Sequence, residues 1–214
     1  MICGSHVHML RDLLHQGGSS LFMHSKEYPV VEFKRENAIE LFESYVSARG
    51  IKVIRAGDLR ELADRAYGIV GGHPFYLISL AEAWNFKTKE KIEKTFEREL
   101  KSPIGSLHVY EDYVLSEDLK EATGGPILRT ILQILASSRN QNDKAAVPLT
   151  LTEIANSLNR PSPQLEPYLA ELVRFDLVTK NEKDKTYLIR DRVLEQYLRM
   201  EAEELNNKKI VLPK

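Results

Sequence analysis

Two glycines and a proline interrupt a long run of helical sequence at residues 69–84, IVGGHPFYLISLAEAW. Gly71 and Gly72 predict the end of one helix, because glycine adopts the left-handed conformation at a helix C-terminus without a steric penalty. Pro74 suits the first turn of the next helix, where the backbone N–H has no helical partner in any case. Nothing in the neighbouring sequence is typical of a catalytic pair. This feature restricts the region to two helices joined by a rigid corner.

Helical periodicity surrounds the corner on both sides. Apolar residues recur at helical spacing after Asn37 as far as Gly50, and again after Asp58 as far as the corner, so Asn37 and Asp58 are the predicted N-caps. Three more helices are predicted over residues 75–84, 88–100 and 109–122. The β-branched centre of YPVVEF, residues 28–33, predicts a strand, and Ile2–Cys3 predict the end of another before a turn and a short helix.

The tripeptide Gly-Gly-Pro at 124–126 is the best candidate for a domain boundary, because it separates two helical patterns and its proline can begin a new helix. After it, a helix over 127–135 precedes a short strand, 148–151, and a helix that Thr152 caps. The remaining predicted elements are a turn at 159–163, a helix at 164–175, a hairpin of 177–180 and 186–189, and a helix at 192–203. This order of elements is the plan of a winged-helix domain.

The composition bounds the class of protein. The chain has 214 residues and a formal net charge of −1, with 43% hydrophobic and 29% charged residues. This balance gives no global attraction to nucleic acid or to an anionic membrane. No apolar run approaches the roughly 20 residues of a membrane span. The N-terminus lacks the pattern of a secretory leader, and the single cysteine, Cys3, suits a reducing compartment. We expect a cytoplasmic protein that does not bind a membrane.

A winged-helix domain is first a candidate for DNA binding, in which its third helix enters the major groove. The candidate contacts are polar and basic residues of that helix and of the hairpin: Gln164, Arg174, Lys180, Lys183 and Lys185. Glu166 and Glu171 share the exposed face of the helix and would repel phosphate, which supplies most of the affinity for duplex DNA. Glu182 and Asp184 lie among the hairpin lysines, so DNA binding is the alternative and not the preferred function.

The sequence lacks the motifs of a self-sufficient enzyme. Nucleotide hydrolysis requires a glycine-rich loop of the form GxxxxGKS or GxxxxGKT, and none is present. Ser5, His6 and His8 are sequence neighbours without an orienting acid or an oxyanion turn at suitable spacing. His8 and His15 could share a helix face, but no third ligand is close to them in sequence. The chain is therefore predicted to have no catalytic residue and no metal site.

Four stretches match a known pattern when they are taken together: Cys3-Gly4-Ser5, Ser20-Leu21-Phe22, Val30–Phe33 and Gly72–Leu77. In this order, and with the helices between them, they resemble the second half of the archaeal ATPase family, which are AAA+ ATPases of the STAND group. The resemblance covers nearly the whole chain. It implies a mainly α fold, α+β in detail. Its parts would be an incomplete remnant of an α/β ATPase core at 1–34, a helical lid with its connector at 35–123, and a winged-helix domain at 124–214.

The resemblance also implies a binding site. Gly4 and Ser5 match the turn near the γ-phosphate of the nucleotide, while Gly72, His73 and Pro74 match the lid corner that packs near adenine. The winged helix would move with the nucleotide state. Two departures weaken the match: Met23-His24 stand where the family usually has Gly-Arg, and no histidine follows His108 to reach a phosphate from the winged helix.

The half that would hold the phosphates is absent from this sequence, as though Met1 fell inside a longer protein. We expect ATP or ADP, with magnesium, to bind only when that half is present, and we expect no catalysis by this chain alone. The expected partner is the missing ATPase core or another protein. The chain would then be a regulatory and interaction module.

Two simpler interpretations remain for particular segments. Gly4-Ser5-His6 with His8-Met9 is also typical of an expression-tag remnant, and Gly72-His73-Pro74 could be a structural helix corner only. A lid without its nucleotide core should expose apolar surface around 30–33 and 75–77, which favours self-association or disorder of the first 30 or so residues.

Overall fold

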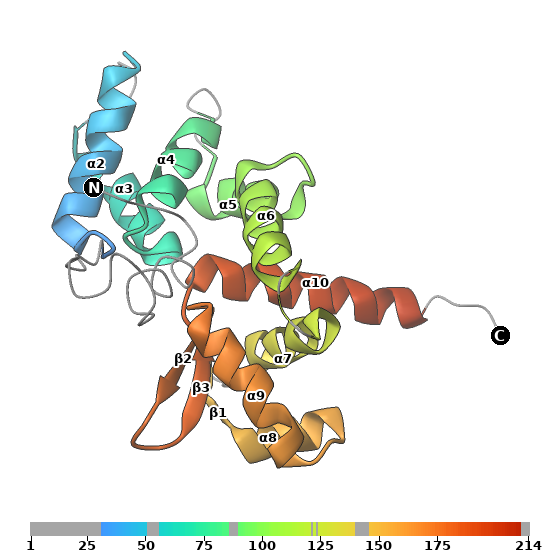
Figure 1. Ribbon diagram of the computed structural model, residues 1–214. Coiled ribbons are helices and arrows are strands. Elements are labelled where there is room, and N and C mark those ends of the chain that lie inside the picture. Colours follow the sequence, from blue (N-terminus) through green and yellow to red (C-terminus); the bar gives the residue numbers. More distant parts are fainter. Residues whose placement is uncertain are drawn as a thin grey trace, which may run out of the picture. The chain divides into compact units, whose positions relative to one another are not determined.

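The chain is mainly helical, with one small antiparallel sheet (Figure 1). The structure is a computed structural model that describes residues 31–50, 56–85, 90–120, 122, 124–139 and 146–210. The chain divides into two compact units, one of Val30–Tyr113 and one that contains Val114–Lys214. The division falls inside a helix, α6, whereas Gly124 is the N-cap of the following helix, α7.

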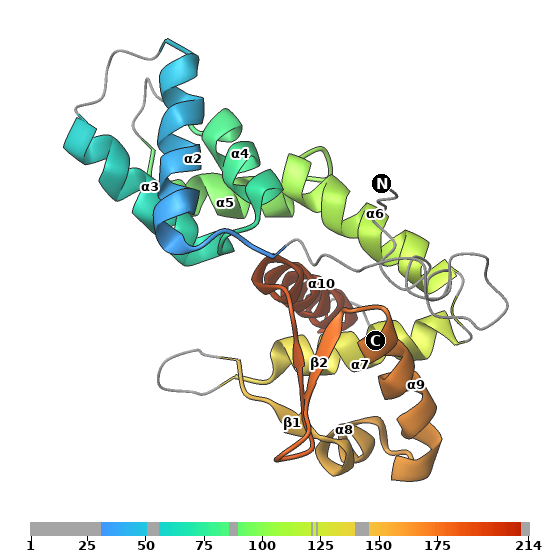
Figure 2. The ribbon, with the colours of Figure 1, turned by 60° about the vertical axis from the view of Figure 1, so that its left-hand side comes forward.

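The first unit is a bundle of helices around one apolar core. Its elements are α2 (Arg35–Ala48), α3 (Ala56–Val70), α4 (Pro74–Ala83), α5 (Ile92–Lys101) and the first half of α6 (Ser106–Lys120). Helices α2 and α3 lie side by side, and both pack against α4 (Figure 2). The side chains of Phe42, Leu77, Leu80 and Ile92 are fully buried in the core of the bundle. The helical prediction for this half is confirmed.

The starts of these helices differ from the predicted ones. Helix α2 begins at Arg35 with Lys34 as its N-cap, and α3 begins at Ala56, so Asn37 and Asp58 lie inside helices and were wrong as caps. The reason at α2 is tertiary, because a hydrogen bond from Phe33 holds the backbone extended only as far as Lys34. The capping preferences of the local residues do not predict such a contact between distant parts of the chain.

Two later helices also begin elsewhere. Helix α5 starts at Ile92, because the carbonyl of Glu90 accepts a hydrogen bond from the Trp84 indole and lies outside the helix. Helix α6 starts three residues earlier than expected. The Glu99 carboxylate accepts the backbone N–H of Ser106 at 3.0 Å, which satisfies one of the free donors at the helix start.

The strand predicted at 28–33 is wrong over its described part. Residues 31–34 have no regular secondary structure. Phe33 makes one backbone hydrogen bond, to Gly72, where a strand would make a ladder. Residues 28–30 lie outside the described part of the chain, as do the predicted elements at Ile2–Cys3 and in the short helix that follows them.

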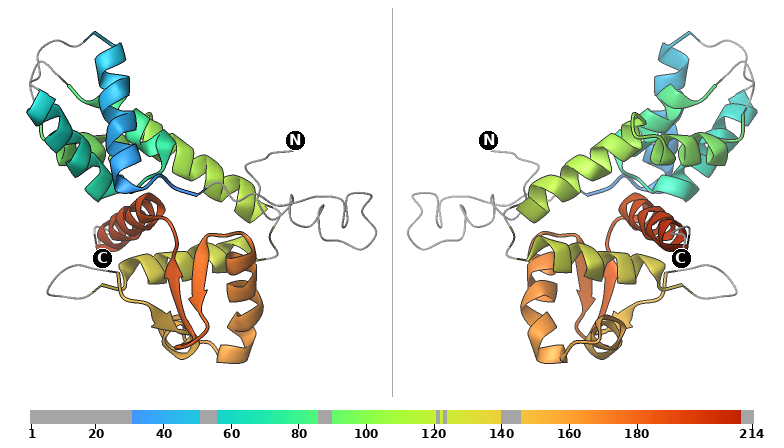
Figure 3. Two further views of the ribbon diagram at one scale, coloured as in Figure 1. Left: turned by 90° about the vertical axis from the view of Figure 1, so that its left-hand side faces the viewer. Right: turned by 90° about the vertical axis from the view of Figure 1, so that its right-hand side faces the viewer.

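The second unit combines helices with a three-stranded sheet (Figure 3). Its elements are α7 (Gly125–Ser137), β1 (Leu149–Thr150), α8 (Leu151–Leu158), α9 (Ser162–Arg174), β2 (Val178–Asn181), β3 (Thr186–Ile189) and α10 (Arg192–Ile210). The strands are antiparallel in the order β1-β3-β2, with Leu149 opposite Tyr187 and Val178 opposite Ile189. Helix α10 packs along α7, and α9 packs against α8 and β2.

The N-cap of helix α8 is two residues earlier than expected. Thr150 is the N-cap, its hydroxyl accepts the backbone N–H of Glu153, and the Glu153 side chain accepts the Thr150 N–H in return. Thr152 therefore lies inside the helix, and β1 is shorter than the predicted strand 148–151 because Leu151 already begins α8. The hairpin prediction is confirmed, and so is the start of α7 at the Gly-Gly-Pro tripeptide.

The expected exposed apolar surface is confirmed in part. Val31, Phe33 and Phe75 are 72%, 39% and 36% exposed, whereas Tyr76 and Leu77 are buried in the bundle. The prediction was wrong for the last two because α4 turns them towards the core. Among the described residues, no helix is both long and apolar enough to cross a membrane.

Candidate functional site

The corner between α3 and α4 is closed by backbone contact with the segment that precedes α2. Gly71 has a left-handed φ of +74°, and its N–H donates to the carbonyl of Tyr67. Helix α3 ends immediately before it, at Val70. A side chain at Gly72 would place its Cβ 2.0 Å from the carbonyl oxygen of Phe33. Only glycine fits at Gly72, and Pro74 then begins α4 in the first turn as predicted.

Two hydrogen bonds fasten the segment to the corner. The Phe33 N–H donates to the Gly72 carbonyl at 3.0 Å, and the Gly72 N–H donates to the Glu32 carboxylate at 3.3 Å. The Gly72 amide therefore already has an anionic partner within the chain. A phosphate or another anion would have to displace Glu32 to reach it.

Aromatic rings from two helices gather behind the corner. The His73 ring lies 4.4 Å from Tyr76 and 6.2 Å from Tyr110, and Phe75 lies 4.3 Å from Tyr110, measured between ring centroids. Beneath them, the buried Tyr76 hydroxyl donates to the Glu111 carboxylate at 2.6 Å. The Nδ1 atom of His73 is buried and makes no hydrogen bond with a described residue. Of this cluster, Phe75 presents a partly exposed ring, whereas Tyr76 and the His73 Nδ1 atom are buried.

Of the residues predicted at the nucleotide, the structure brings Gly72, His73 and Pro74 together at this corner. Gly4 and Ser5 lie outside the described residues. Sequence reasoning missed Glu32, Tyr110 and Glu111. The pattern around residues 110 and 111 gave no signal, because their role depends on packing against a helix more than thirty residues earlier in the chain.

The candidates for DNA contact lie on α9 and on the β2–β3 hairpin of the second unit. Gln164 is exposed near the start of α9, and at its end Arg174 lies over the ring of Phe175 at 5.0 Å and 3.7 Å from Glu171. Lys180 is 3.0 Å from Glu182, and that hydrogen bond is the main reason its pKa is raised. Two of the four cations, Arg174 and Lys180, are thus already near a carboxylate.

The remaining two cations are lysines in the turn between the strands β2 and β3. Lys183 and Lys185 are exposed, and neither makes an ion pair with a described residue. Lys185 has a left-handed φ of 53°, which is set by the tight turn. The turn thus presents two solvated amines beside the acidic Glu182 and Asp184, whereas the face of α9 presents Glu166.

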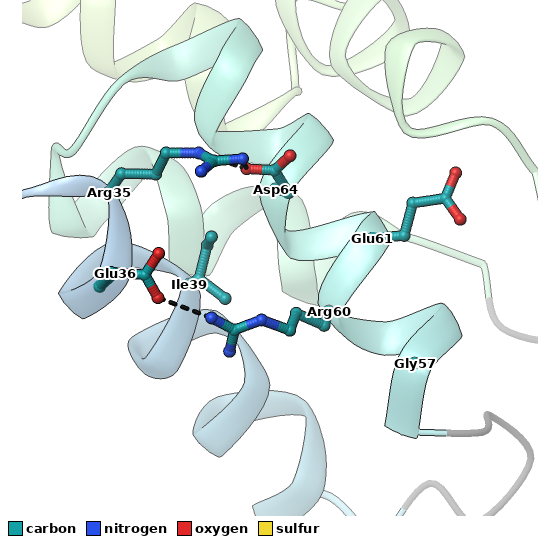
Figure 4. Close-up of a pocket in the computed structure, with 7 residues that line it drawn as sticks. All are labelled: Arg35, Glu36, Ile39, Gly57, Arg60, Glu61 and Asp64. Carbon is teal, nitrogen blue, oxygen red and sulfur yellow. Dashed lines mark hydrogen bonds and ion pairs between the residues drawn. The ribbon is translucent and has the colours of Figure 1, made fainter.

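A second hollow lies between α2 and α3 and is lined with charge (Figure 4). Its volume is about 240 Å³, and Ile39 lies among the charged side chains. Arg35 is 2.6 Å from Asp64, and Arg60 is 2.6 Å from Glu36. Each guanidinium is therefore neutralised by a carboxylate at the surface, where such pairs contribute about 0–1 kcal/mol. The hollow has no uncompensated charge to attract an anion.

The described residues contain no cluster of three or more histidine, cysteine, aspartate and glutamate side chains that could hold a metal ion. The corner presents the partly exposed ring of Phe75 beside Tyr110.

The described fold is similar to that of a solved protein, a Walker-type ATPase of the archaeon Pyrococcus abyssi. The match has a TM-score of 0.64 at 19% sequence identity, and it covers 92% of this chain and 51% of the ATPase chain. This chain shares a fold with an archaeal Walker-type ATPase. It spans about half the length of that protein. No family model and no curated protein sequence matches the chain.

Proposed function

We propose that this chain acts as the helical lid and winged-helix part of a STAND-type Walker ATPase, and that it responds to nucleotide without hydrolysing it alone. The observation that carries the proposal is the Gly72 corner, which is bonded directly to Glu32 and Phe33. The shared fold with a Walker-type ATPase supports the same assignment.

The corner suits the base of a nucleotide better than its phosphates. Phe75 is partly exposed and rests on Tyr110, so it offers a ring for stacking. The Gly72 N–H is already bonded to Glu32. The rings, and not the Gly72 amide, would therefore contact adenine.

Phosphate binding belongs to a different segment in this proposal. The sequence has no GxxxxGKS or GxxxxGKT loop, and such a loop with its magnesium ligands supplies most of the attraction for ATP or ADP. That segment would lie beside residues 31–34, either as an earlier part of the same chain or as part of a partner. Its movement would reach α4 through Glu32 and Phe33.

The test begins with the genomic DNA directly upstream, which should encode a GxxxxGKS or GxxxxGKT loop in a frame that joins or accompanies this chain. The joined or paired protein should bind a fluorescent ADP analogue, and Phe75→Ala should weaken binding roughly tenfold. Gly57→Ala is the control, because its added Cβ meets nothing within 4 Å. Equal binding by Phe75→Ala, or ATP hydrolysis by the chain alone, would overturn the proposal.

DNA binding by the second unit is the second candidate function. It is favoured by Lys183 and Lys185, which are exposed at the tip of the hairpin. It predicts a duplex mobility shift that weakens steeply with salt and is lost in the Lys183→Gln, Lys185→Gln double variant. The absence of a duplex shift would exclude this function, and a shift that the double variant leaves unchanged would contradict the role of these lysines.

A further inference from the structure

Helix α9 and the β2–β3 hairpin enclose a groove that is separate from the α3–α4 corner. Its volume is about 560 Å³, and it lies wholly within the second unit. Figure 3 shows α9 beside the two strands. The residues that line it are Glu166, Pro167, Ala170, Val173, Lys180, Glu182 and Tyr187.

The groove has two defined walls. Glu166, Ala170 and Val173 are four and three residues apart, so they share one face of α9. Lys180 and Tyr187 are direct partners in the antiparallel register, so their side chains lie on the same face of the hairpin. The groove therefore runs between a helix face and a sheet face. Ala170 is small and exposed, which leaves it open, while Tyr187 is 8% exposed and forms its floor.

The charges of the lining are unequal. Two carboxylates, Glu166 and Glu182, face one amine, and the Lys180 Nζ is 3.0 Å from Glu182. Glu166 is exposed and makes no ion pair within the described residues, although it is close enough to contribute to the raised pKa of Lys180 after Glu182. Within the described residues, Glu166 thus has no ion pair of its own, because the nearby Lys180 is bonded to Glu182.

We propose that this groove binds a segment of a partner protein that carries an apolar side chain close to a lysine or arginine. The apolar side chain would pack between Val173 and Tyr187, and the cation would pair with Glu166. Two carboxylates beside the groove oppose DNA phosphates, so protein is the favoured occupant over nucleic acid. This interaction is separate from the nucleotide response proposed above and does not depend on it.

A phage-displayed library of random peptides, each about a dozen residues long, tests the proposal on the full chain. We expect the enriched peptides to share an apolar residue within a few positions of a lysine or arginine. Ala170→Trp fills the groove without changing its charge, and Glu166→Lys reverses the charge at its rim. Each variant should bind the enriched peptides roughly tenfold or more weakly than the unchanged chain does. Glu97→Lys, on an exposed site of α5, should leave their affinity unchanged.

Several outcomes would overturn the proposal. These are no enrichment, enriched peptides without a basic residue, or peptides whose affinity is the same for Ala170→Trp. A dimer in sedimentation equilibrium that Ala170→Trp dissociates would assign the groove to a second copy of the chain. A duplex mobility shift that Ala170→Trp abolishes would assign it to DNA. Circular dichroism of each variant separates lost binding from lost folding.

Discussion

The α3–α4 corner and the α9–hairpin groove are both proposed binding surfaces, but they are built in different ways. At the corner, backbone meets backbone, and the position that Cβ would take at Gly72 is already filled by Phe33. At the groove, side chains of a helix and a hairpin face each other across about 560 Å³ of open space. A surface closed by backbone tolerates no added atom, whereas one bounded by side chains can be refilled or recharged without loss of the fold.

The largest effect should come from Gly72→Ala. Its Cβ would lie 2.0 Å from the Phe33 carbonyl oxygen, so the segment before α2 must move and both of its hydrogen bonds must break. We expect a loss of about 3 kcal/mol in the free energy of unfolding, measured in urea. Gly68→Ala is the matched control, because it lies inside α3 with open space at its Cβ and should gain up to about 1 kcal/mol. Equal stability of the two variants would show that the corner is not closed by Phe33.

Tyr76→Phe should have the next largest effect. It removes the donor at 2.6 Å from the buried Glu111 carboxylate without changing the shape of the ring. Hydrogen bonds to charged groups are stronger than neutral ones, and we expect a loss of about 2 kcal/mol in the free energy of unfolding. Phe75→Tyr is the control, because its hydroxyl would be added to a partly exposed ring. A thermal melt of both proteins distinguishes them, and an unchanged Tyr76→Phe would make this contact dispensable.

Thr150→Ala should have a smaller effect on the unit that contains the groove. It removes the cap of α8 and should cost about 1 kcal/mol of stability. The Thr150 N–H and hydroxyl both donate to Glu153 and lower the pKa of that carboxyl. Because the pKa is lowered in the folded protein, this stabilisation is present above the ordinary glutamate pKa and is lost as the pH falls through the lowered value. The difference between wild type and Thr150→Ala should therefore shrink in acid, and a constant difference would contradict this.

The smallest effect on stability should come from Ala170→Trp. Ala170 is exposed at the open groove, so the larger ring has room, and we expect a change within about 0.5 kcal/mol. Urea unfolding of the variant beside Gly72→Ala measures the contrast directly, because one substitution adds volume at the corner and the other adds it at the groove. A loss comparable to that of Gly72→Ala would mean that the groove is packed as tightly as the corner.

The parts of the fold that sequence predicts well are those in which local chemistry decides. The corner follows from Gly71, Gly72 and Pro74, and the hairpin follows from two short strands around a polar tip. The helix start at Thr150 was also within reach, because Thr-x-x-Glu at 150–153 is a capping-box pattern. The helix begins after Thr150 and not after Thr152, because the reciprocal hydrogen bonds with Glu153 form at Thr150.

Other features could not be predicted because they join distant parts of the chain. The start of α2 depends on a bond from Phe33 to a residue 39 positions later, and Glu111 meets Tyr76 across 35 positions. The groove depends on the register that sets Tyr187 beside Lys180. No local pattern encodes such distances, so the sequence indicated where the corner lies but not what closes it.

The link between Phe33 and Gly72 also sets how the first unit responds to mechanical load. These two residues bracket α2 and α3, so their bond fastens the beginning of the bundle to the turn that follows its second helix. A pull applied at Val31 would therefore load the Phe33–Gly72 hydrogen bond before it loads α2, because this bond lies between the point of force and the helix.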